Sequence, residues 1–183
     1  MAAARSFCRL RREIAPGTRV SALVPEQGMC LSAFLVLSPP AHPGAVLLGR
    51  IRPEADWEQI GGLDANRLPA VQGGWMLPSC HLMIYESPHD AARRIVREQL
   101  ERADLALGPP LVVSDTSSPA HAAPGALHWD LGFVFPGVWE STSAAPPAPW
   151  SRLELVELSG LRSTDVVRGQ ADILAYAGRR LGA

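Results

Sequence analysis

The segment Trp75–Glu101 constrains the fold most, because it joins a short apolar stretch, a loop and a capped amphipathic helix. Ser87 is a favourable helix N-cap, Pro88 suits the first helical position, and Asp90 stands where a capping box has its acidic residue. The pattern predicts a helix to about Arg102. Its apolar residues recur at spacings of three and four: Ala91, Ala92, Ile95, Val96 and Leu100. One face of this helix is therefore expected to be buried.

Strand-like apolar runs lie on both sides of this segment. Cys30–Ser38 and Ala45–Ile51 precede it, and we expect them to be neighbouring strands around a Pro/Gly turn. Between them and the segment, a loop with a helical turn is expected. Further strands are predicted after it, at Leu111–Ser114, Leu127–Phe135 and Arg152–Leu158. A C-terminal helix is predicted to begin at Ser163 or Thr164.

Strands on both sides of amphipathic helices predict an α/β fold, with a mixed sheet between helices. A chain of 183 residues suits one core. We therefore treat 1–183 as a single domain, with an N-terminal extension over 1–29, a loop–helix unit over 75–102 and a C-terminal helix over 163–183.

Composition narrows the class of partner. Hydrophobic residues make up 47% of the chain and charged residues 19%, which is typical of a folded globular protein. The formal net charge of −1 provides no broad cationic field, so we expect neither a nucleic acid nor a membrane as partner. All 17 basic residues are arginine, which excludes lysine chemistry such as Schiff-base formation. A small-molecule substrate is the expected partner, and a homodimer is compatible with the sequence.

The cysteines and the hydropathy pattern bear on the compartment. Cys8, Cys30 and Cys80 are odd in number and lack C-x-x-C spacing, so neither a disulfide framework nor a zinc knuckle is indicated. No apolar run approaches the ~20 residues needed to span a bilayer. These features predict a cytoplasmic protein.

Residues 75–101, WMLPSCHLMIYESPHDAARRIVREQLE, resemble a Nudix box. The family pattern is Gly, five residues, Glu, seven residues, then Arg-Glu-hydrophobic-x-Glu-Glu-x-Gly, introduced by an aromatic residue and Leu-Pro-Gly-Gly. Cys80 takes the glycine place, and the spacing leads to Glu86 and then to Arg94. Val96, Glu98 and Gln99 follow in register. The resemblance implies a Nudix-type α/β/α sandwich with a mixed sheet, and a hydrolase acting on a nucleoside diphosphate linked to another group.

The ligand positions of the box depart from the pattern. In the family, three glutamates share one helix face, and here those positions are Ile95, Glu98 and Gln99. The glycine pair is replaced by Ser79-Cys80. Because Mg²⁺ prefers oxygen ligands, one carboxylate and one amide weaken the site. The box is degenerate, so we assign no cofactor, and magnesium binding is expected to be possible but weakened; if a metal binds, Glu86 and Glu98 are its ligands.

The box and the strand after it supply the candidate site residues. The proposed catalytic group comprises Glu86, Glu98, His81 and Arg94, with Arg94 orienting Glu98 four residues later and with a glutamate pKa raised by apolar neighbours. The proposed substrate-binding group comprises His128, Asp130, Gln99 and Trp75. His128 and Asp130 share one strand face, although an edge strand would also present them to water. For Cys80 we expect a buried thiol.

Three functions follow from this reading. We expect an enzyme that keeps the Nudix fold and acts on a small metabolite by general acid–base chemistry, without a full magnesium cluster. A residual Mg²⁺-dependent pyrophosphohydrolase acting on a nucleoside diphosphate derivative is the first alternative. A domain that binds a ligand or partner without catalysis is the second.

Overall fold

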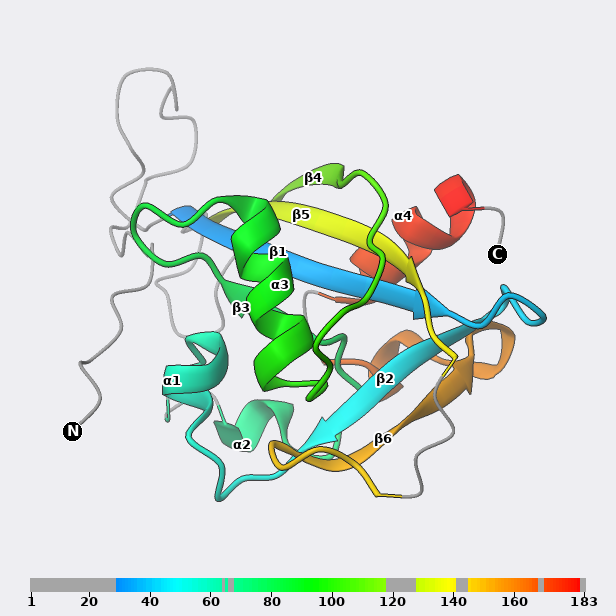
Figure 1. Ribbon diagram of the computed structural model, residues 1–183, viewed down its shortest axis with the longest axis horizontal. Helices are drawn as coiled ribbons and strands as arrows, with labels where there is room; N and C mark the ends of the chain where they lie inside the picture. Colours follow the sequence, from blue (N-terminus) through cyan, green and yellow to red (C-terminus); the bar gives the residue numbers. More distant parts are fainter. Residues whose placement is uncertain are drawn as a thin grey trace.

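A four-stranded mixed sheet forms the centre of the protein (Figure 1). The computed structural model describes residues 29–63, 65, 68–117, 128–140, 145–167 and 170–181. The strand order is β3 (Ser79–His81), β1 (Met29–Ser38), β5 (His128–Val138) and β4 (Leu111–Ser117). β1 runs parallel to β5, whereas β3 and β4 are antiparallel to their neighbours. The predicted mixed sheet is therefore confirmed.

A separate two-stranded ladder pairs β2 (Ala45–Ile51) with β6 (Trp150–Glu157). β1 and β2 follow one another around a turn, as expected, but they do not pair with each other. β1 pairs with β5 along its whole length and with β3 over Ser32–Phe34. β2 takes its partner from near the end of the chain.

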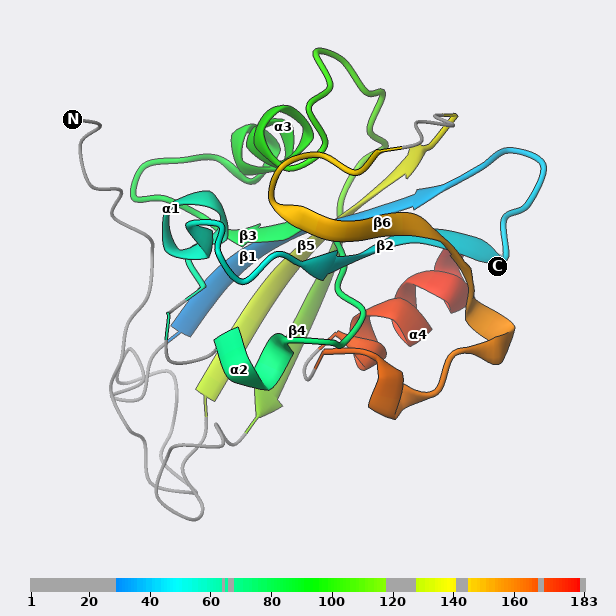
Figure 2. The same ribbon diagram turned by 90° about the horizontal axis from the view of Figure 1, so that it is seen from below.

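Helices cover both faces of the four-stranded sheet (Figure 2). α3 (Pro88–Glu98) buries its apolar stripe against residues of β1 and β5 that point to one side, including Leu35 and Phe135. α4 (Ala171–Leu181) buries Ile173 and Leu174 against the opposite side. The predicted α/β/α sandwich is confirmed. Within the described part of the chain, no helix is long and apolar enough to cross a membrane.

Short helices lie in the connections between strands. They are α1 (Trp57–Gly61), α2 (Leu68–Val71), η3 (Leu158–Gly160) and η4 (Ser163–Asp165). Two of them, α1 and α2, stand where a loop with a helical turn was expected. The C-terminal helix begins at Ala171, later than predicted. The chain before it is extended because Val166 bridges to Trp75 and the N–H of Val167 donates to the Trp75 carbonyl at 2.8 Å.

α3 also ends earlier than the sequence predicted, at Glu98 instead of Arg102. Ser87 caps its start, because its hydroxyl accepts the N–H of Asp90 at 3.1 Å. At the other end, Glu101 adopts a φ of 50°, in the left-handed region that stops a helix. The early end brings Gln99 out of the helix and towards β3.

A pair of tryptophans fills the space between α1, the β2–β6 ladder and the end of α3. The rings of Trp57 and Trp150 meet edge to face with centroids 4.9 Å apart, and both side chains are buried. The Trp150 ring lies directly over Gly49 of β2, where a Cβ atom would overlap it. Glycine at this position is therefore a packing requirement.

Gly49→Ala is expected to destabilise the protein by about 1–3 kcal/mol, since the added methyl group must displace a buried indole. Gly160→Ala is the matched control, because a Cβ there meets nothing within 4 Å. Urea unfolding of both variants measures the difference. Equal stabilities for the two variants would contradict this packing.

Candidate functional site

The loop between β3 and α3 is held to the helix by a buried ion pair. Arg94 donates from Nε to Glu86 Oε1 at 2.8 Å and from Nη2 to Oε2 at 2.7 Å. Its remaining donors reach backbone carbonyls, that of Ile60 at 3.1 Å and that of His81 at 3.0 Å. The Arg94 side chain is 3% exposed and that of Glu86 is 7% exposed. One guanidinium thus joins α1, β3, the loop and α3.

The pair determines the protonation of Glu86. Burial by itself raises the pKa of this carboxyl, but the hydrogen bonds from Arg94 and from the Met83 N–H outweigh burial and hold the pKa below its usual value. The sequence led us to expect a box glutamate with a raised pKa, and Glu86 shows the opposite shift. Glu86 is therefore a carboxylate at neutral pH whose oxygens already accept three hydrogen bonds.

Gln99 binds the backbone of β3 through both ends of its carboxamide. Its Oε1 accepts the N–H of Ser79 at 3.2 Å, and its Nε2 donates to the Ser79 carbonyl at 2.7 Å. We call these two hydrogen bonds the Gln99 latch. Trp150 covers the latch, since its Nε1 donates to the backbone carbonyl of Gln99 at 2.8 Å. The Gln99 side chain is fully buried.

A second glutamine reaches the same strand from the opposite side of the molecule. Gln170, immediately before α4, accepts the N–H of Leu77 at 2.7 Å and donates to the Ser79 hydroxyl at 3.3 Å. Sequence reasoning missed Gln170 because it lies far along the chain and belongs to no motif. Ser79 is thus held by glutamines from both faces.

The donor set does not fit magnesium. Ile95 is buried and offers no ligand atom, and the Gln99 oxygen is engaged by Ser79. Glu86 is engaged by Arg94 and Met83, which leaves Glu98 as the single remaining carboxylate of the box. Among the residues that the structure describes, no group of three His, Cys, Asp or Glu side chains could hold a metal ion. Mg²⁺ requires near-octahedral oxygen coordination, which this arrangement does not supply.

Comparison with known proteins identifies the architecture. No protein-family model matches the sequence, and no curated protein matches it in sequence. Among solved structures, the MutT protein of Methanosarcina mazei Go1 superimposes with a TM-score of 0.58 at 15% identity, over 83% of this chain and 94% of that one. The Escherichia coli dihydroneopterin triphosphate pyrophosphohydrolase gives 0.56 at 14% identity, over 84% and 96%. The chain has the Nudix fold.

A third neighbour is the NUDIX domain of Shewanella oneidensis NrtR, complexed with ADP ribose. It superimposes with a TM-score of 0.56 at 14% identity, over 91% of this chain and 95% of that one. Identities this low establish the fold and nothing about the chemistry. Any chemistry depends on the residues present in the segment 75–101 and around it.

The other residues predicted for the site divide between two places. His81 and Asp130 lie on the same face of the sheet, on strands that flank β1 on either side. His81 Nδ1 and the hydroxyl of Ser32 on β1 share a hydrogen bond of 2.9 Å, a partner that sequence reasoning missed. Trp75 is buried in the cluster beneath α4, away from the Gln99 latch. The side chain of His128 is outside the described residues.

Cys80, at the glycine position of the Nudix box, is buried beneath α3. Its Sγ donates to the carbonyl of Ala91 at 3.7 Å. Burial raises the pKa of this thiol to about 12, so it is protonated at neutral pH. Glu98 is partly exposed. Burial lowers the pKa of Arg94, but the hydrogen bond from Arg94 to Glu86 and, to a smaller extent, the charge of Glu98 raise it above its usual value.

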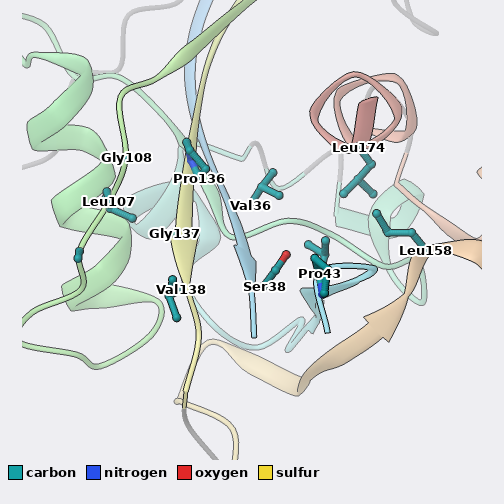
Figure 3. Close-up of a pocket in the computed structure, with 13 residues that line it drawn as sticks. Val36, Ser38, Pro43, Leu107, Gly108, Pro136, Gly137, Val138, Leu158 and Leu174 are labelled. Carbon is teal, nitrogen blue, oxygen red and sulfur yellow. The ribbon is translucent and has the colours of Figure 1, made fainter. Parts of the chain in front are cut away.

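An apolar cavity of about 510 Å³ opens at the carboxyl ends of the parallel strands β1 and β5 (Figure 3). Val36 and Ser38 of β1 form its floor, with Leu174 of α4 and Leu158 of η3 on one side. Leu107, from the segment before β4, lies on the other side. This volume is within the range of small-molecule sites, and the cavity is distinct from the Nudix box.

Glu86→Gln is expected to lower the free energy of unfolding at pH 7 by about 3–5 kcal/mol, because it leaves the Arg94 charge buried without its counter-ion. The loss should shrink in acid. A carboxylate with a lowered folded-state pKa stabilises the fold above its usual pKa of 4.5, and that contribution disappears as the pH falls through the folded value.

Urea unfolding at pH 7 and at acidic pH measures this effect. Glu54→Gln is the matched control, because Glu54 is exposed and should change stability little at either pH. A pH-independent loss in Glu86→Gln would show that packing, and not charge, is responsible.

Proposed function

We propose that this Nudix-fold domain binds a small molecule without cleaving it through a box-bound metal. The observation that carries the proposal is the Gln99 latch. At a position where the family pattern has a glutamate, the carboxamide is fully buried and both of its polar atoms are bonded to Ser79.

The chemistry of the latch supports this reading. A glutamate at position 99 would direct a carboxylate oxygen at the Ser79 carbonyl oxygen, and two acceptors repel unless a cation or proton lies between them. The Nε2–H of Gln99 fills that role at 2.7 Å. The amide therefore supplies by itself the positive contact that a carboxylate would need from a metal.

The architecture around the latch supports the same reading. Trp150 and Trp57 close the space beside Gln99, and Ile95, one turn earlier on α3, is buried in the core beneath that helix. The cavity at the ends of β1 and β5 could hold a small apolar group, although the space beside Gln99 is closed. The NrtR domain complexed with ADP ribose is an example of this fold holding a small molecule.

A metal-independent enzyme is the second candidate function. The observation that favours it is the hydrogen bond between His81 and Ser32, because a histidine next to a hydroxyl is the arrangement used to activate a nucleophile or transfer a proton. Asp130 lies on the same sheet face. This candidate requires a substrate to reach Ser32, which is buried to 8% exposure.

One pair of assays separates these functions. The wild-type protein is incubated with a panel of nucleoside diphosphate derivatives, ADP ribose included, with Mg²⁺, with Mn²⁺ or with EDTA, and product release and melting temperature are measured in parallel. We expect no release in any condition, together with a rise in melting temperature for the compound that binds, because a ligand of the native state stabilises it.

Glu98→Gln and His81→Ala provide the contrasts. Divalent-dependent release that Glu98→Gln abolishes would overturn the proposal in favour of a residual pyrophosphohydrolase. Release in EDTA that His81→Ala abolishes would overturn it in favour of acid–base catalysis. A rise in melting temperature shared by all three proteins, without release, is the result that the proposal predicts.

A further inference from the structure

Two arginines face each other across the β2–β6 ladder. Arg50 and Arg152 are direct partners in the antiparallel register. Both guanidinium groups stack on the ring of Trp75, with Cζ at 4.6 Å from the ring centroid for Arg50 and 5.5 Å for Arg152. Like charges directly opposite each other destabilise a sheet, and the indole ring and the Asp165 carboxylate offset part of this repulsion.

The nearby carboxylates accept their hydrogen bonds from Arg152 and Arg162, although the charge of Arg50 adds to the hydrogen bond from Arg162 in lowering the pKa of Asp165. Glu154 accepts from Arg152 Nε at 2.7 Å. Asp165 accepts from Arg162 at 3.0 Å and 2.7 Å, through its two oxygens. Arg50 is different: its Nε is buried and has no hydrogen-bond partner within the described part of the chain. A buried donor left without an acceptor typically costs about 1–3 kcal/mol.

Arg50 lines a polar cavity of about 710 Å³. Its walls come from the turn after α2, Gln72–Trp75, and from the segment before α4, Thr164–Val167. These two segments are joined by the hydrogen bonds of Trp75 with Asp165 and Val167, which fixes the walls relative to each other. Gly74 permits the close approach, since a Cβ there would lie 3.1 Å from the Val167 side chain.

We infer that this cavity binds an oxyanion, the phosphoryl or carboxylate group of a small molecule, through Arg50. The arginine fork matches both groups and forms strong charge-assisted hydrogen bonds with them. Thr164 and Asp165 also line the cavity. The Asp165 carboxylate accepts hydrogen bonds from Arg162, which offset its repulsion of an anion. The bound anion would also relieve the repulsion between Arg50 and Arg152.

This site is separate from the Nudix box. Arg50 follows Gly49 on β2, and neighbouring strand residues point to opposite faces. Gly49 faces Trp150 and the Gln99 latch, whereas Arg50 faces Trp75. The inference therefore stands whether or not the box is catalytic, and its failure would leave the proposed function untouched.

Isothermal titration of the wild-type protein with inorganic phosphate and, separately, with malonate tests the site at constant ionic strength. We expect saturable binding of at least one anion, weakened about tenfold or more in Arg50→Gln, since a hydrogen bond to a charged group contributes about 1.5–3 kcal/mol. The two titrations distinguish a phosphoryl ligand from a carboxylate ligand. Arg97→Gln, on the exposed face of α3, removes the same charge away from the cavity and should bind as the wild type does.

Arg152→Gln keeps the test valid if Arg50→Gln does not fold, because the Arg152 side chain is 58% exposed. Weaker binding in Arg50→Gln or in Arg152→Gln, but not in Arg97→Gln, supports the site. Absence of saturable binding to the wild-type protein overturns it. Equal weakening in all variants also overturns it, because it would reflect net charge alone.

Discussion

The two hydrogen bonds between Gln99 and Ser79 hold the end of α3 against the edge strand β3, and the surrounding groups are arranged about them. Trp150 covers the glutamine and Gln170 binds Ser79 from the other side. The ion pair of Arg94 with Glu86 fixes the loop between the same two elements. Polar groups buried in this way have to be satisfied internally, because an unpaired one is costly. The segment with the spacing of a Nudix box is thus held in place by buried polar contacts.

Positions 86 and 99, at both of which the family pattern has a glutamate, differ in this chain. Glu86 remains a carboxylate because Arg94 and a backbone N–H stabilise its charge. Position 99, where the family pattern has a glutamate, carries an amide in this chain, and an amide needs neither a cation nor a proton to approach a carbonyl oxygen. In the same fold, binding can then shift to other surfaces, and both described cavities lie away from the latch.

Local features of the sequence predicted the sandwich and the start of α3, because caps and apolar periodicity act within a few residues. Ser87 and the stripe containing Ile95 are examples. Long-range partners were not predictable from local patterns. β2 pairs with β6 from near the end of the chain, and the contacts of Ser79 with Gln170 and of Ser32 with His81 join distant segments. The box spacing identified Gln99 as informative, but only the fold shows that both ends of its amide bind one residue of β3.

The most direct test is the free energy of unfolding of Gln99→Glu, measured in EDTA and in Mg²⁺, beside the exposed-site control Gln72→Glu. The account predicts a loss of about 1–3 kcal/mol in EDTA, because the carboxylate cannot donate to the Ser79 carbonyl, with part of the loss restored by Mg²⁺. The control should be unaffected by either condition. A Gln99→Glu protein as stable in EDTA as the wild type would contradict the account.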